Sequence, residues 1–278
     1  NIIEQLPTIA VQGFTSIQVS PIQKAKQPTM GSPVNDWWTF YQPAEFAIDN
    51  TGVNAMGTKA DFMNLCETAH EYGIYVIVDV VANHMAADYN YSRSPAILDD
   101  IRNDNSCWHN RNSNINKYSS RENITQYDLD SVLDLNTGSK KVQTYVLNYL
   151  KELIDAGADG FRFDAVKYIY YGDTARSADF WNWYMQELRA IKPDIYCVGE
   201  CWSGEAEILE YYGAMNCFNF AMSQAEGTVA AAAKGFSISK TAKRKQVLSS
   251  SRKMARTTFV NRLFSEMKRE RLKASRLS

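Results

Sequence analysis

Ile74-Tyr75-Val76-Ile77-Val78-Asp79 is the stretch that decides the fold of this chain. Its β-branched, apolar character is typical of a strand buried on both faces of a parallel sheet. Apolar residues at helical spacing precede it, at Phe62, Leu65, Ala69 and Tyr72. Thr58 and Asp61 form a capping-box pattern that starts this helix, and Gly73 ends it. The segment therefore predicts a helix that runs directly into a buried strand.

The same helix–strand unit recurs along the chain. A helix is expected from about residue 139 to Gly157, followed by a strand at 160–163. A second helix is expected at about 177–191, followed by a strand at 195–199. Strands are also expected at 14–19, after a helical stretch, and at 215–220. This alternation predicts an α/β fold, with a parallel sheet and helices outside it.

A segment rich in Asn, Asp and Ser, residues 85–136, separates the strand at 74–79 from the next helix. A structureless loop of this length is uncommon in a compact domain unless it has a function. We therefore expect it to be a small domain that is inserted into one strand–helix loop.

Charged residues end three of the apolar strands. Asp79 follows the first, Asp164 follows the strand that carries Arg162, and Glu200 follows the strand at 195–199. Burying an unpaired charge is costly, and the carboxyl ends of parallel strands meet at one edge. We therefore expect these groups to converge on one site.

Two of these carboxylates are expected to differ in charge state. Residues two apart on a strand point the same way, so Arg162 should lower the pKa of Asp164 and keep it ionised as a nucleophile. Glu200, beside Cys201 and Trp202, is expected to have less charged surroundings, a raised pKa and the role of proton donor. Such a pair is what retaining glycoside cleavage requires.

Three motifs now resemble a known family. Asp79-Val-Val-Ala-Asn83-His84, then Gly160-Phe-Arg162-Phe-Asp164-Ala-Val-Lys167, then Gly199-Glu200 resemble the first three conserved regions of the α-amylase superfamily, glycoside hydrolase family 13. Trp37-Trp38-Thr-Phe-Tyr41-Gln42 resembles the sugar-stacking segment of true α-amylases. Leu133-Asp134-Leu135-Asn136 resembles the family's motif near the end of domain B. The likeness extends over about residues 1–225.

This resemblance implies a (β/α)8 TIM-type barrel, of which about five of eight strands are recognisable, with domain B inserted after the third barrel strand. It implies retaining endo-hydrolysis of α-1,4-glucosidic bonds in starch-like glucans. Asp164 would be the nucleophile, Glu200 the general acid/base, and Arg162 the residue that orients the nucleophile. The implied substrate-binding residues are Trp37, Trp38, Tyr41, Gln42, Asp79, His84 and Lys167.

A structural calcium ion is also implied by the resemblance, since Ca²⁺ takes oxygen ligands from carboxylates, amides and carbonyls. Its implied ligands are the side chains of Asn83 and Asp134 and the backbone carbonyl of Tyr168. Many α-amylases have His at the last of these positions. The backbone carbonyl can bind calcium whichever side chain is present. The sugar contact that the family's His side chain makes does not carry over to Tyr168.

Charge divides the chain into an acidic body and a basic tail. From residue 234 onward there are 14 Lys and Arg against 2 Asp and Glu, which leaves 16 against 29 before it. The expected domains are 1–84 (barrel), 85–136 (domain B), 137–233 (barrel) and 234–278, a non-homologous or disordered tail. In the tail, Val260, Leu263, Phe264 and Met267 also fit a basic amphipathic helix for a membrane surface or partner.

Composition narrows the function classes further. With 45% hydrophobic and 22% charged residues, disorder of the whole chain is excluded. The longest apolar candidate for a membrane span, residues 75–82, is short and contains Asp79. The five cysteines have no CxxC metal spacing, and their disulfide state is open. We expect an α-glucan partner, no nucleic acid, no membrane, a monomer and, from the polymeric substrate, secretion.

The family's fourth region, a His-Asp pair, has no counterpart here. The histidines are His70, His84 and His109, and no Asp follows Asp194. We therefore expect this chain to fold poorly, with open sheet edges prone to aggregation, and to hydrolyse starch weakly or not at all. Two alternatives stay open: another family activity (oligosaccharide α-glucosidase, transglycosylase or branching enzyme), or a non-catalytic glycan-binding or scaffold domain.

Overall fold

The computed structural model of the chain describes residues 2–26, 37–51, 57–169 and 180–220. The chain divides into two units, of which the first, residues 1–202 with 206–218, contains nearly all of the described residues. The sheet and the helices packed on it belong to the first unit. None of the helices in the described part of the chain is long and apolar enough to span a membrane.

A parallel sheet is the centre of the first unit. Among the described residues its order is β1-β4-β9-β10-β11, and every neighbouring pair is parallel. The strands are β1 (Ser16–Val19), β4 (Tyr75–Val80), β9 (Gly160–Phe163), β10 (Tyr196–Gly199) and β11 (Asn216–Cys217). All five predicted strands are therefore confirmed, in one sheet.

The strand bounds differ from the sequence-based ones at several ends. The first strand lacks Phe14 and Thr15, and the last is only Asn216–Cys217. β4 continues one residue past Asp79, which therefore lies inside the strand and not after it. The reason is pairing: Asp79 and Val80 both have partners in β9, namely Arg162 and Phe163.

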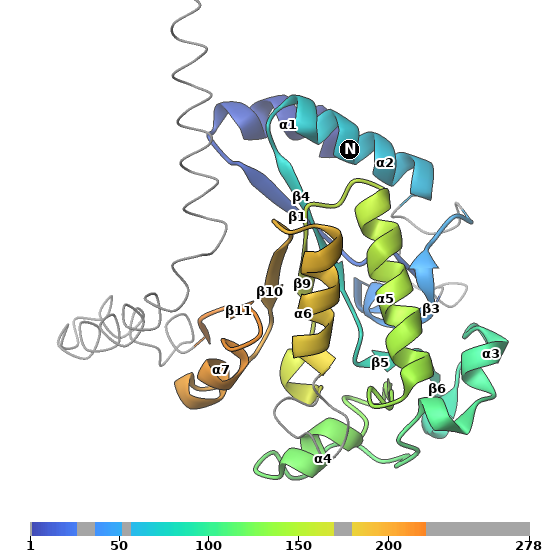
Figure 1. Cartoon of the computed structure of the whole chain (residues 1–278). Helices are drawn as coiled ribbons and strands as arrows, with labels where there is room; N and C mark the ends of the chain where they lie inside the picture. The colour runs from blue at the N-terminus through green and yellow to red at the C-terminus, as the bar shows by residue number, and fades with distance from the viewer. Residues whose placement is uncertain (1, 27–36, 52–56, 170–179, 221–278) are drawn as a thin grey trace, which may run out of the picture. The chain divides into compact units, whose positions relative to one another are not determined.

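Helices cover the sheet (Figure 1). α5 (Lys140–Asp155) and α6 (Phe180–Ile191) lie side by side along one face, while α1 (Ile2–Val11) and α2 (Lys59–Glu71) lie together at one end. The predicted capping box of α2 is present, with the Thr58 N–H donating to Asp61 Oδ2 at 2.8 Å. The next helix is expected to start at about residue 177. That position lies in residues 170–179, which are outside the described ranges.

Aromatic side chains join the sheet to α6. Phe163 of β9 and Trp181 of α6 have ring centroids 5.0 Å apart, and both are buried. Tyr184 donates a hydrogen bond to the carbonyl of Gln143 at 2.5 Å, which ties α6 to α5. These contacts pack α6 against β9, the strand that carries Arg162, and hold β9 in place.

The segment between β4 and α5 is built from short elements and belongs to the same compact unit as the sheet. They are β5 (His84–Met85), β6 (Ala87–Asp88), η2 (Tyr89–Tyr91), β7 (Ser92–Arg93), α3 (Asp99–Arg102), η3 (Asn105–Cys107), α4 (Arg121–Gln126) and β8 (Leu133–Asp134). β5 pairs antiparallel with β8, which brings His84 opposite Asp134. The remaining elements are β2 (Gln23–Ala25), η1 (Trp37–Tyr41), β3 (Pro43–Ile48), η4 (Val166–Tyr168) and α7 (Glu205–Tyr211).

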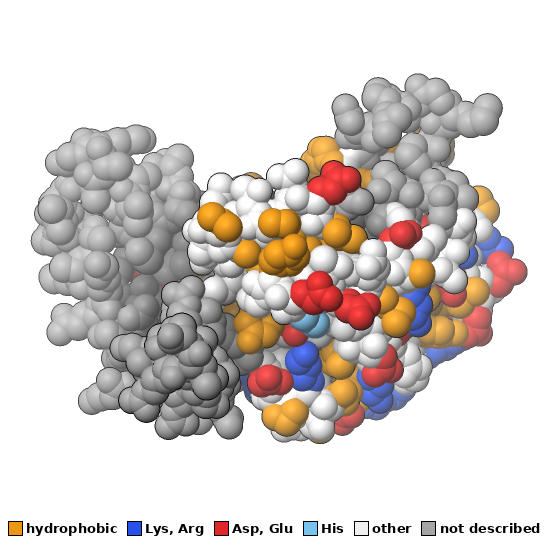
Figure 2. Space-filling view, turned by 90° about the horizontal axis from the view of Figure 1, so that it is seen from above, with side chains coloured by type: hydrophobic (Ala, Val, Ile, Leu, Met, Phe, Trp, Pro, Cys, Tyr) orange, Lys and Arg blue, Asp and Glu red, His pale blue; other side chains and the backbone are white. Residues whose placement is uncertain are grey.

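Charged side chains of both signs mix with hydrophobic ones on the face seen from above, the side on which α1 and α2 lie (Figure 2). The five cysteines are buried and unpaired. The carboxylates predicted to converge lie elsewhere: Asp79 is the next-to-last residue of β4, and Asp164 and Glu200 directly follow β9 and β10.

Candidate active site

Sheet register brings the predicted carboxylates together. Asp79 pairs with Arg162 across β4 and β9, while Phe163 pairs with Gly199 across β9 and β10. Asp164 and Glu200 each follow the last residue of their strand, so they leave neighbouring strands at the same height. The sequence-based expectation of a shared site at these strand ends is confirmed.

One guanidinium group holds three carboxylates. Arg162 Nη1 lies 2.6 Å from Asp79 Oδ1 and 2.8 Å from Asp164 Oδ1, and Arg162 Nη2 lies 2.9 Å from Glu200 Oε2. Its side chain is only 9% exposed. Since the two terminal nitrogens belong to one planar group, Asp164 and Glu200 are held close together on the same side of the sheet.

The expected pKa of Asp164 is wrong in direction. Burial, together with the charges of Asp79 and Glu200, raises the pKa of this carboxyl to about 7, although Arg162 opposes this rise. The error arose because the sequence shows the neighbouring arginine but not the desolvation or the two other carboxylates that share it. The group is therefore only partly ionised near neutral pH in the free protein.

The surroundings of Glu200 also differ from the expectation. Instead of a less charged environment, its Oε2 accepts from Arg162 and, at 3.3 Å, from the backbone N–H of Ala165. Ala165 has φ 53°, the left-handed conformation, and this turn directs its N–H toward Glu200. Sequence spacing gave no signal for this alanine, because nothing in its side chain marks the backbone conformation.

Asp79 and His84 are committed to protein groups. Asp79 accepts from the Tyr41 hydroxyl at 2.8 Å as well as from Arg162, and it is 1% exposed. His84 Nε2 donates to the Tyr41 carbonyl at 2.9 Å, and burial lowers its pKa to about 4, so the ring is neutral. In this structure both residues hold Tyr41, from its side chain and its main chain respectively.

The predicted stacking residues are at the surface. Trp37 is 67% and Trp38 is 42% exposed, so neither is a core residue. Trp37 makes an edge contact with Tyr41, at 5.9 Å between ring centroids. Gln42 has a buried side-chain oxygen without a hydrogen-bond partner. Lys167 Nζ, expected to contact a sugar, donates to the Trp202 carbonyl at 2.7 Å.

The implied calcium ligands fit a cation in their oxygen chemistry. Asn83 Oδ1 and Asp134 Oδ1 are both buried and have no hydrogen-bond partner. They lie near each other, because the Leu135 N–H donates to the backbone carbonyl of Asn83 at 3.0 Å and β5 pairs with β8. Within the described ranges no group of three or more His, Cys, Asp or Glu is arranged to hold a metal, but Ca²⁺ also accepts amide and carbonyl oxygens.

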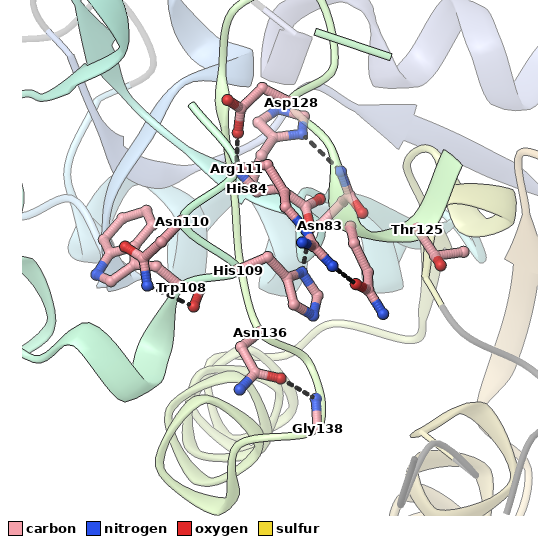
Figure 3. Close-up of polar contacts among 12 residues, drawn as sticks. Asn83, His84, Trp108, His109, Asn110, Arg111, Thr125, Asp128, Asn136 and Gly138 are labelled. Carbon is pink, nitrogen blue, oxygen red and sulfur yellow. Dashed lines mark hydrogen bonds and ion pairs between the residues drawn. The ribbon is translucent and has the colours of Figure 1, made fainter. Parts of the chain in front are cut away.

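Sequence reasoning missed two neighbours of this oxygen pair. His109 Nδ1 lies 2.5 Å from Asp134 Oδ2, and Asp128 accepts from the backbone N–H groups of Asp134 and Ser113. Figure 3 shows His109 and Asp128 in the same cluster as Asn83 and His84. His109 is 25 residues from its partner, so no local spacing could have joined them.

Comparison with known proteins gives one family match. A family model described as "Alpha amylase, catalytic domain" matches residues 1–276. This range includes most of the segment 234–278, which we expect to be non-homologous and which the structure does not describe. The domain boundaries given above thus stay predictions.

The similar proteins are α-amylases and, by structure, a transferase. The α-amylase of Clostridium acetobutylicum is 37% identical over 205 residues, which cover 72% of this chain and 26% of that protein. The structure of CldA, described as a cyclomaltodextrin glucanotransferase, has a TM-score of 0.72 at 20% identity, covering 90% of this chain and 52% of that one. A variant of α-amylase I from Eisenia fetida, in complex with maltohexaose, has a TM-score of 0.64 at 22% identity, covering 80% and 47%.

The matched proteins are longer than this chain, and the solved structures among them are similar to it in fold. The chain spans about a quarter of the length of the curated relative and about half of each of the two solved chains. At such identities the structural likeness concerns the fold, and it identifies the five-stranded parallel sheet as an arc of the predicted (β/α)8 barrel.

Proposed function

The chain belongs to the α-amylase catalytic-domain family, and on that premise we propose that it carries the nucleophile and the acid/base of a retaining hydrolase of internal α-1,4-glucosidic bonds in starch-like glucans. The observation that carries the proposal is the bridge made by Arg162, which holds Asp164 and Glu200 together.

The two carboxyl groups divide the chemistry. The Asp164 carboxylate attacks the anomeric carbon, while Glu200 gives its proton to the leaving glycosidic oxygen as that C–O bond breaks. Glu200 then takes a proton from water, whose oxygen displaces Asp164 from the sugar. Arg162 favours the ionised form of Asp164, which opposes the effect of burial on its pKa.

Exposed aromatic rings favour a glucan chain as substrate. Trp37 and Trp38 present surface that sugar C–H faces cover well, and Tyr41 lies beside them with its hydroxyl fixed on Asp79. The maltohexaose bound by the Eisenia fetida relative is an oligomer of this chemical class. An extracellular monomer is the setting that we propose for such a polymeric substrate.

Calcium would be held by Asn83, Asp134 and the carbonyl of Tyr168. Bound there, it would supply charge that compensates the buried Asp134 carboxylate and would join β8 to the loop between β4 and β5. The support is the pair of buried oxygens, on Asn83 and Asp134, that lack partners.

Turnover by this polypeptide alone is proposed to be weak or absent, because no His-Asp pair follows Glu200 in its 278 residues. The same absence is what favours the alternative of a non-catalytic glycan-binding domain. Product analysis on amylose against maltose separates endo-hydrolysis from α-glucosidase or transferase activity. Robust turnover of dye-labelled starch would refute the proposed impairment.

A covalent-trapping experiment tests the nucleophile even where turnover is slow. A fluorinated α-glucosyl fluoride, which carries its own leaving group, should add one glycosyl mass to Asp164, located by peptide mass mapping. Asp164→Asn should abolish the label, and Glu200→Gln should lower any starch turnover by about a hundred- to ten-thousand-fold. Asp155→Asn, at an exposed acid on α5, is the matched control. Labelling that persists in Asp164→Asn would exclude this aspartate as the nucleophile.

A further inference from the structure

The side-chain oxygens of Asp134 have unequal environments. Oδ2 accepts from His109 Nδ1 at 2.5 Å, whereas Oδ1 is buried without a hydrogen-bond partner. His109 is also bound to the same residue through its backbone, because its N–H donates to the Asp134 carbonyl at 3.3 Å. One residue thus fixes both the main chain and the carboxylate plane of Asp134.

Asp128 provides an internal comparison in the same cluster. Its Oδ1 accepts from the N–H of Asp134 at 3.0 Å, and its Oδ2 accepts from the N–H of Ser113 at 2.9 Å. Both carboxylate oxygens therefore accept backbone hydrogen bonds, and Asp128 joins the segments that contain Ser113 and Asp134. Asp134 differs because His109 occupies one oxygen and leaves the other available.

Asn83 is oriented in a similar way by the other histidine of the cluster (Figure 3). Its Nδ2 lies 3.4 Å from His84 Nδ1, and its Oδ1 is buried without a partner. Because His84 Nε2 donates to the Tyr41 carbonyl, its Nδ1 is the acceptor for this amide. A histidine nitrogen therefore contacts one side-chain atom of each ligand residue. The other atom, Oδ1 in both Asp134 and Asn83, stays available to a cation.

We propose that His109 is a positioning residue for a divalent cation: by holding Asp134 Oδ2 it presents Oδ1, together with Asn83 Oδ1, to calcium. This inference rests on the calcium site of the proposed function and adds to it the residue that sets ligand geometry. Hydrogen-bond partners of metal ligands fix ligand orientation, and losing one weakens metal affinity by about 10- to 100-fold.

The test is calcium affinity of the intact chain, measured by competition with a fluorescent chelator after EDTA treatment and dialysis. His109→Ala, which removes the donor, should weaken calcium binding by about 10- to 100-fold. His109→Asn, whose amide can donate from near the Nδ1 position, should recover most of that loss. His70→Ala is the matched control. His70 Nε2 lies 2.7 Å from Asp159 Oδ2, and this pair does not include a calcium ligand. This variant should leave calcium affinity unchanged.

A second readout separates positioning from general stability. Urea unfolding in saturating calcium and in EDTA gives the stabilisation due to calcium, and His109→Ala should reduce that difference. Equal affinity in wild type and His109→Ala, or no recovery in His109→Asn, would overturn the positioning role while leaving the calcium site intact. Absence of calcium binding by the wild-type chain would overturn both.

Discussion

Replacing Arg162 by Met removes the positive charge shared by three carboxylates while keeping much of the side-chain volume. In the wild-type chain Asp79 is 1%, Asp164 13% and Glu200 23% exposed at the side chain. Breaking a buried ion pair costs about 3–5 kcal/mol, because the remaining charges are left buried and unpaired. We expect Arg162→Met to lower the free energy of unfolding by this amount near neutral pH.

The pH dependence follows from the pKa of Asp164. Its pKa is raised from 3.8 to about 7 by burial and by neighbouring carboxylates, so the folded state binds a proton that the unfolded state releases between these values. Stability should therefore fall as pH rises through this window, by up to about 4 kcal/mol for this group. Without Arg162 the carboxylates should bind protons still more tightly. The loss caused by Arg162→Met should thus be smaller at about pH 5 than at about pH 8.

Urea unfolding followed by tryptophan fluorescence measures both effects. Arg111→Met is the matched control, because Arg111 pairs with Glu122 at 3.4 Å with both side chains well exposed, and surface pairs contribute about 0–1 kcal/mol. A loss in Arg162→Met no larger than in Arg111→Met would contradict the three-carboxylate bridge. So would a loss that increases toward acid pH.

Two further changes test the packing of the sheet and the start of α2. Gly160→Ala should lower the free energy of unfolding by about 3 kcal/mol, since a Cβ there would lie 2.5 Å from the Tyr196 carbonyl oxygen. Gly204→Ala, where a Cβ would meet no atom within 4 Å, should lower it little. Equal urea midpoints for the two variants would refute this. Thr58→Ala removes the capping box and should cost about 1 kcal/mol, with faster amide exchange in the first turn of α2. Unchanged exchange there would show that the cap is not needed.

Interactions within a few residues could be predicted from the sequence. The capping box of Thr58 and Asp61, the helix–strand alternation, and the approach of Arg162 to Asp164 all involve short separations, where chain geometry alone fixes the neighbours. Convergence of Asp164 with Glu200 was predictable too, because parallel strands place their carboxyl ends at one edge.

Only the tertiary structure decided the electrostatics and the pairing of distant groups. The pKa of Asp164 depends on burial and on Asp79 and Glu200, which reach it from other strands. The contact of His109 with Asp134 joins two segments that fold back on each other. Sequence therefore determined which local elements form and which charges end them. Desolvation and shared partners are sums over neighbours that the chain order does not show, and these set what each charge does.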